Sequence, residues 1–240
     1  MQRQRLNRIG HLALPIVGGM VSQVVLNLVD TAMVGVLGKE ALAGVGTASF
    51  ATFMATALVM GLSSGVQTMA ARRVGEGRGD EAAVPLNGGL LLALVIGLPM
   101  SIVLLAYSST LFPLINADQG VVDAGLPYFD ARLLGVVAVG MNFAFRGYWT
   151  GVSQSRRYLH TLLVIHVANI AISYVLIFGK FGFPEMGTEG SGLGTTISLY
   201  LGTLVYFALG WKEARKNGFL SRIPRRETMA TMLRLSVPAA

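Results

Sequence analysis

The chain has 240 residues, of which 53% are hydrophobic and only 13% are charged. A soluble domain carries about 25% charged residues, so this composition indicates a polytopic membrane protein. There is no cysteine, which excludes disulfide bonds and thiolate metal sites.

Six apolar stretches alternate with short polar connections, and each stretch is long enough to cross a bilayer as a helix. We therefore expect an all-α, polytopic transmembrane helical bundle. The predicted spans lie at about 12–37, 47–71, 86–107, 124–150, 158–180 and 190–211. The first stretch is too long for the core of a signal peptide and is predicted to be a retained span.

The basic residues gather on one side of this arrangement. They precede the first span, follow the second, bracket the end of the fourth and follow the sixth. Of the 19 Lys and Arg residues, all except Lys39, Arg132 and Lys180 belong to this group. This positive-inside pattern predicts a multi-pass protein of the inner (plasma) membrane with a cytoplasmic N-terminus. It also explains the net charge of +7 without a nucleic-acid partner.

In the first span, Asp30 is a carboxylate within an otherwise apolar run. Such residues are costly in a bilayer and usually face a cavity, a partner or an ion path. Asn27 lies one turn before Asp30, so the two can share a helix face. We interpret Asp30 as a proton or cation site, with a structural hydrogen bond to a neighbouring helix as the alternative.

The fourth span begins with Tyr128, Asp130 and Arg132. An arginine within a membrane needs a partner, which Asp130 or a position at the membrane interface could supply. Tyr128 is a candidate to reach Asp30 across the bundle. No Ser-His-Asp order, HExxH helix or Cys/His cluster is visible, so the sequence does not predict an enzyme.

The fifth span places Asn169 and Ser173 on one helix face, and the sixth opens with GSGLGTT, which includes Thr195. Carboxylate, amide and hydroxyl oxygens suit a hard cation. Polar contacts between helices explain Asn169 and Ser173 equally well, and close helix packing is the main alternative for the glycines.

Residues 1–211 are predicted to form a six-helix transmembrane lobe, followed by a basic cytoplasmic linker at 212–228. We expect the linker to contain a short amphipathic piece at the membrane surface that uses Phe219, Leu220 and Ile223. The chain then ends in MLRLSVPAA, which is similar to IGHLALPIV at the first span. Because transporters are commonly built from repeated halves, we expect 229–240 to begin a truncated second lobe.

Four sequence elements together resemble the MATE (multidrug and toxic compound extrusion) family, closest to its DinF-like branch. They are LALPIVGGMVSQVVLNLVDTAMVGVLG in the first span, ARRVGEG after the second, FRGYWTGVSQSR after the fourth and GSGLGTT in the sixth. The resemblance covers essentially the whole chain and implies the N-terminal half of a two-lobe transporter with a central cleft. It implies a secondary active transporter, not an enzyme, that exports organic cations or other xenobiotics by antiport with H⁺ or Na⁺ and needs no other cofactor.

The resemblance also implies site residues. Asp30 matches the carboxylate that takes the coupling ion, Asn169 its amide partner and Thr195 the threonine beside it, a set that could hold Na⁺. The family often has an aspartate one turn beyond that asparagine, and here the residue is Ser173, which favours protonation of Asp30. Tyr128 and Asn27 complete the candidate site. The expected partners are a small amphiphilic or cationic substrate, the lipid bilayer and a second six-helix lobe.

Two further functions stay open on the sequence. One is a lipid-linked oligosaccharide flippase of the same superfamily, which an arginine-lined cleft would favour and for which Arg132 is the visible candidate. The other is a non-transporting membrane scaffold or a half-length remnant, in which Asp30 could be replaced by Asn without effect.

Overall fold

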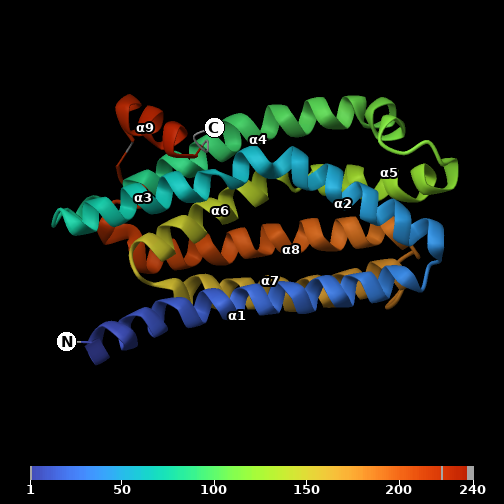
Figure 1. Cartoon of the computed structure of the whole chain (residues 1–240). Coiled ribbons are helices and arrows are strands. Elements are labelled where there is room, and N and C mark those ends of the chain that lie inside the picture. Colours follow the sequence, from blue (N-terminus) through green and yellow to red (C-terminus); the bar gives the residue numbers. More distant parts are fainter. Residues whose placement is uncertain (1, 223, 237–240) are drawn as a thin grey trace.

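The computed structural model describes residues 2–222 and 224–236, with side chains from residue 13 onward, and these parts of the chain are helical throughout apart from short turns (Figure 1). The long helices are α1 (Gln2–Gly35), α2 (Lys39–Met60), α3 (Leu62–Gly75), α4 (Val84–Leu111), α5 (Gln119–Leu133), α6 (Val136–Gly151), α7 (Ser155–Phe178) and α8 (Gly187–Leu209). A short α9 (Arg226–Ser236) follows.

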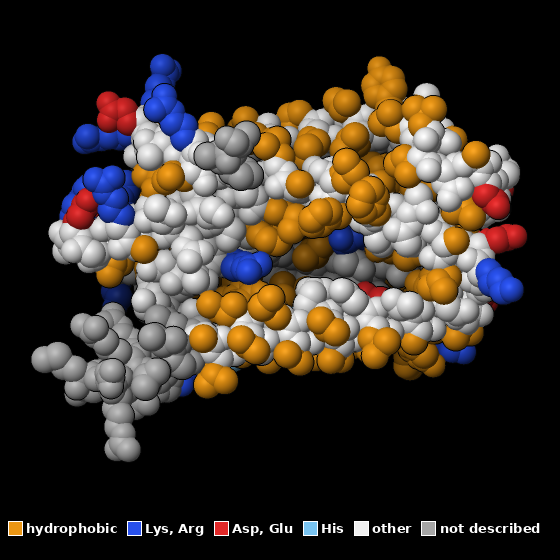
Figure 2. All heavy atoms as spheres, viewed as in Figure 1, with side chains coloured by type: hydrophobic (Ala, Val, Ile, Leu, Met, Phe, Trp, Pro, Cys, Tyr) orange, Lys and Arg blue, Asp and Glu red, His pale blue; other side chains and the backbone are white. Residues whose placement is uncertain are grey.

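The predicted six-span bundle is confirmed. Within the described residues, five helical segments are long and apolar enough to cross a membrane, and α5 with α6 makes a sixth if that bent pair is one span. Figure 2 shows charged side chains gathered at the two ends of the molecule and hydrophobic side chains between them. The second span begins at Lys39 instead of 47, because a tight turn at Gly38, with a φ of 115°, leads directly from α1 into α2.

The bend between α5 and α6 measures 53° and lies within the predicted fourth span. A break at membrane depth frees backbone carbonyls, which need other donors because lipid supplies none. Hydroxyl groups of neighbouring helices fill this role: Thr196 Oγ1 donates to the Ala131 carbonyl (2.8 Å), Ser101 Oγ to that of Leu133 (2.7 Å) and the Tyr200 hydroxyl to that of Leu134 (2.9 Å). Side chains of neighbouring helices therefore stabilise the break.

The helices pack in neighbouring pairs: α7 lies against α1 and α8, α2 against α5, and α6 against α3 and α4 (Figure 1). Small residues permit the closest approach. A Cβ placed on Gly44 of α2 would come within 2.7 Å of the Gly125 backbone nitrogen on α5. Such backbone contact is typical of helices that associate in lipid.

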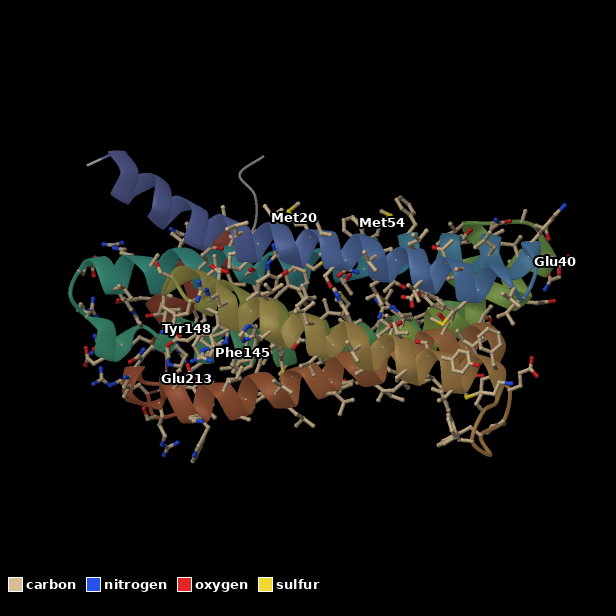
Figure 3. All side chains as sticks on the ribbon, turned by 90° about the horizontal axis from the view of Figure 1, so that it is seen from below. Met20, Glu40, Met54, Phe145, Tyr148 and Glu213 are labelled. Atoms are coloured by element: carbon tan, nitrogen blue, oxygen red, sulfur yellow. The ribbon has the colours of Figure 1, made fainter. Side chains whose placement is uncertain are left out.

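The predicted linker folds back onto the bundle. Phe219 is fully buried and packs against Phe145 and Phe207, with ring centroids 5.8 and 6.0 Å apart. In Figure 3, Phe145 and Tyr148 lie at the same end as Glu213, with Glu40 at the other end. The predicted membrane-surface role of Phe219 is therefore wrong, because its ring completes an aromatic cluster inside the lobe.

Polar contacts hold the linker as well. Asn87 of α4 donates from Nδ2 to the carbonyls of Gly218 (2.8 Å) and Arg222 (2.9 Å), and its Oδ1 accepts from the Leu220 amide (3.0 Å). Arg222 also pairs with Asp80 and Glu81. The predicted contributions of Ile223 and of 237–240 lie outside the described residues.

Candidate functional site

Among the described residues, five buried side-chain oxygens have no hydrogen-bond partner. Two are Oδ1 of Asp130 and Oγ of Ser155, and the other three are Oδ1 of Asp30 on α1 and, on α7, Oδ1 of Asn169 and Oγ of Ser173. Asn169 and Ser173 are buried, and Asp30 is half-buried. We call these three residues, together with Thr195, the oxygen cluster. Buried polar atoms in proteins are normally satisfied, so this concentration needs an explanation.

The contact between α1 and α7 shows at which depth in the bundle Asp30 lies. Ser22 Oγ and His166 Nδ1 lie 2.6 Å apart, and the two helices run side by side in the same direction (Figure 1). Because both helices rise about 1.5 Å per residue, following them equally far from this pair leads to Asp30 on α1 and to the neighbourhood of Ser173 on α7. Asp30 and Ser173 therefore lie at the same depth.

Helix α8 closes the cluster from the other side. Asn169 Nδ2 donates to Thr195 Oγ1 at 2.9 Å, and that hydroxyl donates to the Ser191 carbonyl at 3.0 Å. A Cβ on Gly194 would collide with Ser173, so the glycine lets α8 approach α7 at this point. The structure thus brings Thr195 of the sixth span together with Asn169 and Ser173 of the fifth.

Tyr128 and Asn27 have other partners. The Tyr128 hydroxyl accepts a hydrogen bond from Ser49 Oγ at 3.2 Å, and no hydrogen bond of the described residues joins it to Asp30. Asn27 Oδ1 accepts from Gln23 Nε2 at 3.0 Å. Tyr128 is therefore engaged with α2, and Asn27 with its own helix.

Asp130 is not the partner of Arg132. No ion pair joins them in the described part of the chain, since residues two apart on a helix do not face each other. Arg132 instead lies within electrostatic reach of Asp30. Two of its guanidinium nitrogens, Nε and Nη1, are buried and find no hydrogen-bond acceptor among the described residues.

A cavity of about 700 Å³ runs beside the oxygen cluster, between α1, α2 and the helices from α5 to α8. Figure 2 shows a hollow in the middle of the molecule, with basic side chains and an acidic one in view along it. The polar part of its wall includes Gln23, Asn27, Ser49, Thr52, Arg132, Asn142, Arg146, His166, Asn169 and Thr195. Met20, Val24, Phe53, Phe143 and Leu162 supply apolar surface.

Arg146 is a cavity residue that the sequence placed with the cytoplasmic charges. Its guanidinium lies over the rings of Phe143 and Tyr158, 5.4 and 5.2 Å from their centroids. The available signal was its position inside the predicted span 124–150, next to aromatic residues that can hold a cation.

The comparisons with known proteins agree with this fold. The MatE family model matches residues 15–175. The chain is 31% identical over 210 residues to a probable multidrug resistance protein NorM of Synechococcus sp., covering 86% of this chain and 45% of that protein. It is 26% identical to the multidrug resistance protein NorM of Photobacterium profundum, covering 99% and 53%.

Among solved structures, an outward-facing multidrug resistance MATE family transporter of the MOP superfamily superposes with a TM-score of 0.82 at 27% identity. The match covers 95% of this chain and 50% of that one. The chain thus spans about half the length of the relatives that it matches, and its place in the DinF-like branch stays a prediction. With a family model that covers most of its length and a matching fold, this chain belongs to the MATE family of transporters.

Proposed function

We propose that this chain is the N-terminal lobe of a MATE multidrug exporter in which Asp30 takes the coupling ion. The observation that carries the proposal is the set of unpartnered buried oxygens on Asp30, Asn169 and Ser173. Ionisable groups within membranes are rare and usually mark ion pathways. The relatives named as multidrug resistance proteins supply the substrate side of the proposal.

A proton suits the oxygen cluster better than Na⁺. Asn169 already uses its Nδ2 to donate to Thr195, so its Oδ1 is left as an acceptor, and Ser173 Oγ is a second one. A protonated Asp30 carries an O–H donor, which the ionised carboxylate lacks. Ser173 brings no second negative charge, and a hard cation prefers several oxygen ligands with carboxylates among them.

Helix α1 is the element that responds to the proton in this proposal. Few of its described side chains are buried, and Val21, Val24, Val25 and Leu28 are all more than half exposed. An element with few buried contacts moves at low cost. Protonation of Asp30 from outside then lets α1 repack against α7, close the cavity and expel the substrate.

The rest of the proposal concerns the domain boundaries of the chain and its orientation in the membrane. The lobe comprises residues 1–211 in the inner membrane with a cytoplasmic N-terminus, 212–228 link it to a second lobe, and 229–240 begin that lobe. The exposed apolar face of α1 then meets lipid or the second lobe.

The test is Asp30→Asn in the full gene product that contains this chain, expressed in a drug-sensitive bacterial strain. We expect proton-driven dye efflux and drug resistance to fall to background, while expression and melting temperature stay at the unmodified level. Asp123→Asn is the matched control, because Asp123 is exposed and lies outside the cavity. Undiminished efflux in Asp30→Asn would refute the coupling role and favour the scaffold function.

A further inference from the structure

The charges around the cavity point to the kind of substrate that it takes. Among the described residues that line it, the charged ones are Arg132 and Arg146, and no Asp or Glu is present. The inference below rests on the proposed function, because it takes this cavity as the substrate site of the lobe.

Arg132 is half-buried, and part of its guanidinium lacks hydrogen-bond acceptors among the described residues. Its Nε and Nη1 are buried without an acceptor, and within the described chain it has no ion pair closer than 4.0 Å. Taking a charge out of water is expensive unless hydrogen bonds and an opposite charge replace the water. The planar fork of an arginine suits a carboxylate, sulfonate or phosphate, each of which offers two oxygens side by side.

Arg146 has a different role because it already has partners. Two aromatic rings hold its guanidinium, whereas Arg132 has no comparable contact among the described residues. The two arginines lie on opposite sides of the break, and ten residues of α6 alone span about 15 Å. Arg146 therefore provides attraction along the cavity, and Arg132, whose Nε and Nη1 lack acceptors among the described residues, provides the anchor.

The rest of the wall fits an amphiphile. A volume of about 700 Å³ falls within the range of pockets that hold drug-sized ligands, about 300–1,000 Å³. Met20, Phe53 and Phe143 offer flexible and aromatic apolar contacts. We propose that Arg132 anchors the acidic group of an amphiphilic substrate in this cavity, so that the lobe takes acidic amphiphiles in place of simple organic cations.

The charge of Asp30 affects how strongly Arg132 attracts an anion. Arg132 lies within electrostatic reach of Asp30, so an ionised Asp30 weakens the attraction of Arg132 for an anion. Protonation of Asp30 removes this opposing charge while the cavity is open. Expulsion of the substrate therefore depends on closure of the cavity and not on the charge of Asp30.

The test compares two dyes that share one ring system. Anilinonaphthalene sulfonate carries the acidic group, and phenylnaphthylamine lacks it. Binding is measured by fluorescence to the full gene product in lipid nanodiscs, with empty nanodiscs subtracted. Arg132→Gln should weaken sulfonate binding about tenfold or more, the usual scale for a lost charge-assisted hydrogen bond, and leave amine binding unchanged. Arg132→Lys should restore part of the loss.

Two further variants sharpen the result. Arg146→Gln should weaken sulfonate binding less than Arg132→Gln does. Arg72→Gln is the control for charge alone, because Arg72 is an exposed arginine that does not line the cavity. Equal weakening of both dyes by Arg132→Gln would show a merely structural role, and no weakening of either would also overturn the proposal.

Failure here and failure of the proposed function are distinguishable. Dye binding needs no transport, so it can be measured in variants that do not export. Normal efflux by Asp30→Asn would refute the coupling role whatever the dyes show. Unchanged sulfonate binding in Arg132→Gln would refute the acidic substrate and leave the coupling role standing.

Discussion

Two buried polar regions of this lobe differ in whether their hydrogen bonds are complete. Where the linker docks, Asn87 uses both its amide hydrogens and its oxygen on the backbone of Gly218, Leu220 and Arg222. In the oxygen cluster, Asp30, Asn169 and Ser173 each keep a buried oxygen without a partner among the described residues. Both regions are built from polar side chains in an apolar bundle, yet only one is saturated.

The difference separates structural from functional polar groups. A saturated network specifies one arrangement of the chain, and its members are costly to remove. An unsaturated one is costly as it stands, and such sites in native proteins call for a water molecule, a ligand, an ion or a proton. Asn87 therefore fixes the linker against α4, whereas the oxygen cluster keeps the unpaired acceptors that our proposal assigns to a proton on Asp30.

The largest effect on stability is expected from Asn87→Leu. The substitution keeps the branched shape of the side chain but leaves two buried carbonyls and one amide without their partner. We expect a loss of about 2–4 kcal/mol in the free energy of unfolding, seen as a lower melting temperature in detergent. A melting temperature equal to that of the unmodified protein would show that water replaces these hydrogen bonds. The position of the linker would then not depend on Asn87.

A much smaller stability effect is expected from Ser173→Ala. The hydroxyl has no partner in the described chain, so its removal should change the free energy of unfolding by less than about 1 kcal/mol. Efflux should nevertheless respond more weakly to an imposed proton gradient, because a protonated Asp30 loses one of its acceptors. Marked destabilisation with normal coupling would reverse the assignment and make Ser173 a structural residue.

The sequence predicted the parts of the molecule that depend on local patterns. Apolar runs identified the spans, and a carboxylate in a span identified Asp30, because the cost of charge in lipid is independent of the fold. The family resemblance set Thr195 beside Asn169, and in the structure Asn169 Nδ2 donates to Thr195 Oγ1 at 2.9 Å. Their part in ion coupling stays a prediction.

Other features depend on contacts between distant segments and could not be predicted. Phe219 looked like a membrane-surface residue because its burial requires the rings of Phe145 and Phe207. Arg146 looked like a cytoplasmic charge because Tyr158, which holds it, lies on another helix. The break that positions Arg132 is stabilised by Thr196 on α8, which no local pattern reveals.

The central claim is that the oxygen cluster binds a proton on Asp30. Infrared difference spectroscopy on the full gene product, with the pH lowered in the absence and presence of Na⁺, tests it most directly. The account predicts the carbonyl stretch of a protonated carboxyl group that appears on acidification, persists in Na⁺ and is missing in Asp30→Asn. A spectrum in which Asp30→Asn removes no such band, or in which Na⁺ abolishes it, would contradict the account.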